Sequence, residues 1–308
     1  RKAIPLLKRI DPIFAETLFR SYCGMEAPKG IKDSVRLITE AAEECYPVMG
    51  EELSPQNCLV LDLSAGSELI EGDPLRNTPG EMGERIKNEL TATDRKYAVG
   101  RFLEPRILYS SPVFQGDQYT TVQDRTIHLG MDIFATAGAP VYAPLDGDVY
   151  DFSYNEGELD YGHMIILKHG REDADNFYTL YGHLSKKSIQ GLSRGSKIKK
   201  GDVFARLGSP HENGGWSPHL HFQLISDLMN YGTDYPGVCR PWEKEAWEIL
   251  SPDPNLFLKI PPECFPASTA CYGTTLNKRM KYFAGNLGLS YRKPVKAIRG
   301  WKHYLYDD

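Results

Sequence analysis

The chain has 308 residues, of which 41% are hydrophobic and 25% are charged, and its formal net charge is −5. This composition is typical of a soluble globular protein with more than one domain, and it offers no basic surface for nucleic acid or an anionic membrane. No apolar run approaches the roughly 18 residues that a membrane span requires. The cysteines are scattered without a CxxC motif, which indicates free thiols in a reducing compartment. They are Cys23, Cys45, Cys58, Cys239, Cys264 and Cys271.

The first 110 residues predict a small α/β module. Apolar residues at helical spacing predict helices over 11–25, 32–50 and 79–90, and two apolar runs predict strands over 57–67 and 96–109. The run VLDLSAGS ends a strand in small residues, but it matches neither the Walker A nor the GxGxxG pattern. We therefore expect a capping or docking module rather than a phosphate site, with Asp62 unexplained.

The sequence HLGMD places His128 and Asp132 four residues apart with Gly130 between them. In a straight strand these side chains would be roughly 13 Å apart, too far to share one ion whose ligands lie about 2 Å away. A bend at Gly130 would bring them together, because glycine tolerates the unusual backbone dihedrals of such a bend. A helix would also do so, but the next residues, 132–147, carry two glycines, two prolines and β-type alternation.

Short runs rich in Val, Ile, Tyr and Phe fill residues 125–226, with turn sequences at close intervals, and predict hairpins in an antiparallel sheet. His183 ends one such run, in TLYGHLS. His219 and His221 stand two apart in SPHLHFQL, so they share one face of a strand, roughly 6.6 Å apart along it. An HxH pair alone is weak, because two half-buried histidines on a strand are common. HxxxD, GHL and HxH in this order are much more specific together.

These motifs, with the flanking APVYAPLDGDVY, RGSKIKKGDVFARLG and GGWSPHLHF, resemble lysostaphin/LytM-type zinc metallopeptidases over about residues 125–227. The resemblance covers about a third of the chain. It implies an α+β protein whose core is an antiparallel, barrel-like all-β metallopeptidase domain with a duplicated hybrid motif, preceded by the α/β module. The relatives include peptidoglycan-cleaving endopeptidases, so a peptide or peptidoglycan-like substrate is expected.

The same resemblance implies the site residues. His128, Asp132 and His221 would bind zinc, with a water as fourth ligand, and His183 and His219 would form the catalytic pair. Asp117 or Gln118 would be candidates to occupy the fourth position, as in latent members of the family. The remaining histidines have no expected role at the metal. They are His163, His169, His211 and His303.

The last residues, 281–308, resemble the opening of class III pyridoxal-phosphate aminotransferases. Fused polypeptides are known that join an aminoglycoside-phosphotransferase-like kinase, a metallopeptidase of this type and such an aminotransferase, and this chain resembles their middle. The expected domains are an α/β module over 1–110, the metallopeptidase over 111–260, and a linker with the start of an aminotransferase domain over 261–308. The kinase-like and aminotransferase domains would be partners in one cytoplasmic polypeptide.

Three functions remain open at this stage. The first is a zinc metalloendopeptidase that hydrolyses a peptide or amide bond with a metal-activated water. The second is a non-catalytic zinc-binding scaffold or regulatory domain between the kinase-like and aminotransferase-like partners. The third is a sugar-phosphotransferase carrier domain, which HLGMD and HLH argue against. A zinc-stabilised scaffold needs only the three ligands, so His183 and His219 favour the enzyme.

Overall fold

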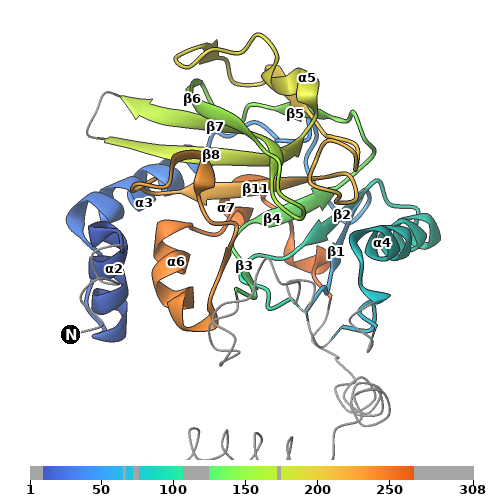
Figure 1. Ribbon diagram of the computed structural model, residues 1–308, viewed down its shortest axis with the longest axis horizontal. Helices are drawn as coiled ribbons and strands as arrows, with labels where there is room; N and C mark the ends of the chain where they lie inside the picture. Colours follow the sequence, from blue (N-terminus) through green and yellow to red (C-terminus); the bar gives the residue numbers. More distant parts are fainter. Residues whose placement is uncertain (1–9, 65–66, 72–75, 107–124, 172–174, 267–308) are drawn as a thin grey trace, which may run out of the picture.

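A computed structural model describes residues 10–64, 67–71, 76–106, 125–171 and 175–266 (Figure 1). Several sequence predictions fall outside these ranges and stay predictions. They concern Cys271, His303, the candidate fourth ligands Asp117 and Gln118, and the aminotransferase-like residues 281–308.

The N-terminal region has the predicted order of helices and strands. It contains α2 (Pro12–Tyr22), α3 (Lys29–Ala42), β1 (Cys58–Leu61), α4 (Pro79–Thr93) and β2 (Tyr97–Gly100). The Asp11 side chain caps α2 by accepting from two backbone amides of its first turn. Four of these elements, α2, α3, β1 and β2, end earlier than predicted. The chain after α3 contains Pro47 and Gly50, and the chain after β2 turns away at Leu103, whose φ is +50°.

The rest of the described chain is mostly β-structure, as predicted. Its strands are β3 (Ile127–His128), β4 (Met131–Phe134), β5 (Pro140–Tyr142), β6 (Gly147–Asn155), β7 (Gly162–Arg171), β8 (Asp175–Leu184), β9 (Lys197–Ile198), β10 (Val203–Arg206), β11 (His219–Ile225) and β12 (Val238–Cys239). Its helices are α5 (Lys186–Ile189), α6 (Lys244–Leu250) and α7 (Asn255–Leu258), with 3-10 turns at Gly232–Asp234, Pro241–Glu243 and Pro262–Cys264. Among the described helices, none has the length and apolar content to cross a membrane.

One eight-stranded sheet organises the molecule, in the order β1-β2-β4-β11-β8-β7-β6-β9. All its pairings are antiparallel except β1 with β2, so the mostly antiparallel α+β prediction is confirmed. The strands β5 and β10 form a second small sheet, and β3 and β12 a third. Within the described ranges the large sheet has two edges, β1 and β9, so the expected barrel closure is not seen. The duplicated motif stays a prediction.

The hydrophobic core lies on both faces of the sheet. In β7, Ile165 and Leu167 join one buried cluster, and Met164 and Ile166 join the other, which explains the continuous apolar run in this strand. The helices α2 and α6 pack together over the second cluster, where the Phe14 and Trp247 rings lie 5.1 Å apart (Figure 1). The helix α4 lies at the other end of the sheet, beside β2 (Figure 1). The five cysteines of the described part are free thiols, as predicted.

His169 is a buried structural histidine of β7. Its Nδ1 donates to the Asp146 carbonyl (2.9 Å), and its Nε2 hydrogen-bonds with the Thr179 hydroxyl (2.8 Å). Burial lowers the pKa of His169 from 6.5 to about 4, although the Asp146 contact opposes this. The structure therefore gives His169 a role in the core.

We expect His169 to make folding stability depend on pH. The unfolded chain binds this proton near pH 6.5 and the folded chain only near pH 4, so the stabilisation is present above pH 6.5 and is lost as the pH falls toward 4. The free energy of unfolding of the wild type should fall more steeply than that of His169→Gln, by about 1.4 kcal/mol per pH unit in this window. Urea unfolding of the metal-free proteins at several pH values measures the two slopes, and parallel curves would show that His169 is not buried in its neutral form.

Candidate metal centre

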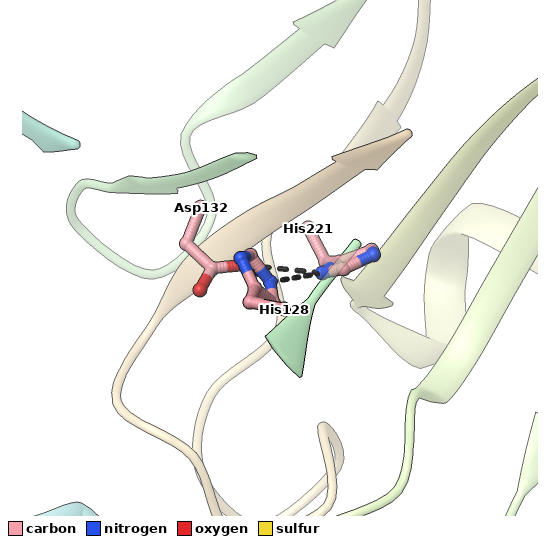
Figure 2. Close-up of side chains that lie close together, drawn as sticks. All are labelled: His128, Asp132 and His221. Carbon is pink, nitrogen blue, oxygen red and sulfur yellow. Dashed lines mark hydrogen bonds and ion pairs between the residues drawn. The ribbon is translucent and has the colours of Figure 1, made fainter. Parts of the chain in front are cut away.

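Three strands bring the predicted ligands together. His128 ends β3, Asp132 lies in β4, and His221 lies in β11 directly opposite Asp132 in the antiparallel register. Figure 2 shows the three side chains pointing toward one another. All three are buried, and among the described residues they are the group of His, Cys, Asp and Glu side chains able to hold a metal ion.

The distances fit a small tetrahedral ion. His128 Nε2 lies 3.1 Å from His221 Nδ1 and 3.2 Å from Asp132 Oδ1, and His221 Nδ1 lies 3.1 Å from Asp132 Oδ1. Ligand bonds of about 2.0–2.1 Å around zinc place neighbouring donor atoms about 3.3 Å apart. Two imidazoles and one carboxylate also match the three-ligand sets of catalytic zinc sites, which leave one position for water or substrate.

Hydrogen bonds on the outer side fix the form of both imidazoles. His128 Nδ1 donates to the Arg101 carbonyl (3.1 Å), and His221 Nε2 donates to Gln223 Oε1 (3.0 Å). The Gln223 amide is itself oriented, because its Nε2 donates to the Pro236 carbonyl (3.2 Å) and the Ser251 hydroxyl (2.8 Å). In neutral imidazoles the inner nitrogens then carry lone pairs that face the Asp132 carboxylate, an arrangement that a cation stabilises.

Gly130 permits the bend between β3 and β4, but not for the reason expected. Its φ is not in the left-handed region. A Cβ at this position would lie 2.6 Å from the His221 ring and 2.8 Å from the Phe222 carbonyl oxygen. Gly130 is therefore required by the close approach of β11, because any side chain would displace the candidate ligand His221.

The substitution Gly130→Ala should weaken zinc binding. The added methyl group has to displace the His221 ring, and disturbed ligand positioning typically costs about 10–100-fold in metal affinity. Competition with a chelator measures this change. Gly80→Ala is a matched control, because a Cβ at Gly80 meets no atom within 4 Å. Equal zinc affinity in both variants would contradict the close packing of Gly130 against His221.

The Asp132 carboxylate has a partner that sequence reasoning missed. Arg106 Nη1 donates to Asp132 Oδ2 (2.5 Å), and Arg106 Nε donates to Glu104 Oε2 (2.9 Å). Arg106 lies 26 residues before Asp132, in the region predicted as a separate module, and no sequence pattern links the two. Gln223, in contrast, could have been found, because it follows His219 and His221 on the same face of β11.

The structure also places His183 and His219 beside the triad. Their ring centroids lie 4.2 Å apart, and His219 Nε2 lies 3.7 Å from Asp132 Oδ1. His219 Nδ1 donates to the Ser217 carbonyl (2.6 Å) and His183 Nδ1 to the Asn213 carbonyl (3.0 Å), so each ring has Nε2 available. His183 has a φ of +61°, next to a register shift between β7 and β8. Such strain is common where a bulge aims a side chain into a site.

Burial and neighbouring charges keep the Asp132 carboxylate charged and favour the neutral form of three imidazoles, those of His128, His183 and His219. Burial opposes ionisation of Asp132, yet His128 and the Arg106 guanidinium outweigh it and hold the pKa of Asp132 well below its usual value. Burial, followed by the Arg106 charge, lowers the pKa of His128 to about 4. Burial also lowers the pKa of His219, and burial with the neighbouring His219 and His221 lowers that of His183 strongly. These charge states are the ones that metal binding requires.

Two cavities meet the site from different sides. The larger, of about 250 Å³, is bounded by Tyr161, Trp216 and the chain from Asp234 to Val238. The smaller, of about 50 Å³, lies between the site and α4, whose Met82 and Ile86 line it. Trp216 borders both cavities, and its indole nitrogen is buried without a hydrogen-bond partner among the described residues.

The other described histidines are not part of the triad, as expected. His163 stacks on Tyr154 at a centroid distance of 4.3 Å and its Nδ1 donates to the Glu212 carbonyl (2.8 Å). His211 is exposed in the loop before β11.

Comparison with known proteins identifies similarity over the central part of the chain. Residues 126–231 match the model of peptidase family M23. An uncharacterized metalloprotease of Haemophilus influenzae is 38% identical over 97 residues, which are 32% of this chain and 18% of that protein. The L-Ala–D-Glu endopeptidase of Bacillus subtilis is 31% identical over 132 residues, 40% of this chain and 38% of that protein. This chain therefore spans less than two fifths of the length of either relative.

Among solved structures, the catalytic domain of lysostaphin from Staphylococcus simulans is 25% identical with a TM-score of 0.30, covering 44% of this chain and 80% of that domain. The five site residues predicted from the sequence all lie inside the segment that matches the family model. Arg106 lies outside it. Residues 126–231 are thus the part of the chain that is similar to peptidase family M23, and they carry the candidate metal centre.

Proposed function

We propose that this chain is a zinc-dependent metalloendopeptidase. The observation that supports it best is the convergence of His128 Nε2, Asp132 Oδ1 and His221 Nδ1 at 3.1–3.2 Å from one another. In each of these three side chains, the polar atom on the other side makes a hydrogen bond to the protein. The atom that faces the site therefore keeps its lone pair for a cation. The match of residues 126–231 to peptidase family M23 supports the same function.

In this proposal the three ligands would bind zinc, and His183 and His219 would transfer protons as general acid and base. Zinc bound there would act as a Lewis acid on the scissile carbonyl and would lower the pKa of water to about 7. His219 and His183 each present Nε2 beside the site, where a neutral imidazole can accept the proton of the attacking water and return it to the leaving amine. Their Nδ1 atoms stay bound to backbone carbonyls, so the rings are oriented before substrate arrives.

The substrate we propose is a peptide, of the kind found in peptidoglycan. The curated relative from B. subtilis is named as an L-Ala–D-Glu endopeptidase, and one from Vibrio cholerae as a peptidoglycan DD-endopeptidase. The five free thiols of the described part support a reducing, cytoplasmic setting, in which peptides and small amides would be encountered. Fusion to kinase-like and aminotransferase domains is a further part of the proposal and rests on the similarity of residues 281–308.

A substrate panel tests this function. The zinc-loaded chain would be incubated with muropeptides, glycyl peptides and small amino-acid amides, and products identified by mass spectrometry. We expect cleavage of at least one peptide, which a chelator abolishes and added zinc restores. If the zinc-loaded wild type cleaves none of them, the peptidase proposal is contradicted, and the non-catalytic zinc-binding scaffold becomes the better-supported function.

A further inference from the structure

The segment that follows β2 lies directly against two of the three candidate ligands, although it precedes the part that matches the family model. Leu103 N donates to the His128 carbonyl (2.9 Å), and His128 N donates to the Glu104 carbonyl (3.1 Å). The Arg101 carbonyl accepts from the His128 ring. In the neighbouring strand pair, Gly100 lies opposite Asp132. Residues 100–106 therefore contact His128 and Asp132 through both backbone and side chains.

Charged side chains in this segment form a hydrogen-bonded network that ends at the Asp132 carboxylate. Glu104 accepts from Arg101 Nε (2.8 Å), Arg106 Nε (2.9 Å) and the backbone of Leu63 (2.9 Å), so both of its oxygens are held. The Arg106 side chain is 3% exposed and that of Glu104 1%, so their geometry is set by the interior and not by solvent. Asp62, which the sequence left unexplained, forms an ion pair with Arg101 at 2.5 Å and is the last residue of this network on the side away from Asp132.

We propose that Arg106 is a positioning residue of the metal centre. Its planar guanidinium joins two carboxylates, Glu104 through Nε and Asp132 through Nη1. Because Arg106 engages Asp132 Oδ2, the other oxygen, Oδ1, is turned toward the two imidazole nitrogens and is the one presented to a metal. Asp62, Glu104 and Asp132 outnumber Arg101 and Arg106 by one charge, so the network leaves the site anionic while Arg106 orients the ligand.

The strand β2 is shaped to admit this guanidinium. A Cβ at Gly100 would lie 2.4 Å from Arg106 Nη2 and 3.1 Å from Leu63 Cδ1. Since Gly100 faces Asp132 in the register, a side chain there would push the arginine away from its carboxylate partner. The inference rests on the proposed zinc function, because it concerns how zinc is held.

Zinc affinity and the absorption spectrum of the cobalt-substituted chain test this role without any substrate. We expect Arg106→Lys, which keeps the charge but loses the fork, to bind zinc about 10–100-fold more weakly and to shift the cobalt bands. Arg106→Gln should do the same. Arg194→Gln is the control, since the Arg194 side chain pairs with Asp151 and contacts neither Glu104 nor a candidate ligand. Its affinity and spectrum should stay close to those of the wild type.

Gly100→Ala is a second test, because it displaces the Arg106 guanidinium without changing the net charge of the site. It should weaken zinc binding as Arg106→Lys does. It and Arg106→Lys decide the outcome if Arg106→Gln fails to fold. Zinc affinity in the Arg106 variants equal to or tighter than that of the wild type would overturn the inference, as would an equal loss of zinc affinity in Arg194→Gln. A wild-type chain that binds no zinc would instead refute the proposed zinc function, and the role of Arg106 with it.

Discussion

Replacing His221 with alanine should leave the chain unable to retain zinc. His221 Nδ1 is one of three donor atoms spaced 3.1–3.2 Å apart, and its ring is fixed by Gln223 on the opposite side. Two remaining donors cannot complete the protein part of a zinc site, which uses three or four. After dialysis against a weak chelator, elemental analysis should find about one zinc per wild-type chain and almost none in the variant.

His211→Ala provides the control for this measurement. His211 is exposed in the loop that leads into β11, so its removal should leave the zinc content at the wild-type value. A His221→Ala chain that retains zinc as well as His211→Ala does would refute the ligand assignment.

Replacing His219 with alanine should preserve zinc and remove most of the hydrolysis. Its Nε2 lies 3.7 Å from Asp132 Oδ1, beside the donor atoms but outside their triangle. Loss of a general acid–base group typically lowers turnover by about 10²–10⁴-fold. His183→Ala should have a similar effect, because the two rings lie 4.2 Å apart and both present Nε2.

Zinc analysis and turnover of a cleaved peptide, measured on the same preparations, separate this effect from loss of the metal. Turnover near the wild-type value in the zinc-loaded His219→Ala chain would exclude the catalytic role. Simultaneous loss of zinc would instead make His219 a ligand.

Local sequence patterns predicted the strand that carries His219 and His221, because alternation along a strand depends only on neighbouring residues. The same rule places Gln223 with them, and the structure confirms that it fixes the ring of His221. The bend at Gly130 was also predictable, but its cause was not. It depends on the approach of His221 from a strand about ninety residues later, which the local sequence does not contain.

The contribution of the N-terminal region could not be predicted. Its helices and strands follow from apolar spacing, but nothing in that spacing indicates that β2 pairs with β4 in the same sheet. Arg106 and Glu104 look like ordinary surface charges in the sequence, and only the tertiary fold buries this pair and brings Arg106 against Asp132. Buried ion pairs are long-range contacts, so composition and periodicity carry no information about them.

Diffraction from crystals of the zinc-loaded wild-type chain, recorded on both sides of the zinc absorption edge, tests the central claim most directly. We expect one anomalous peak between His128 Nε2, Asp132 Oδ1 and His221 Nδ1, within roughly 2.0–2.2 Å of each atom. No peak at these three residues, or a peak bound by other side chains, would contradict the claim that they form a zinc centre.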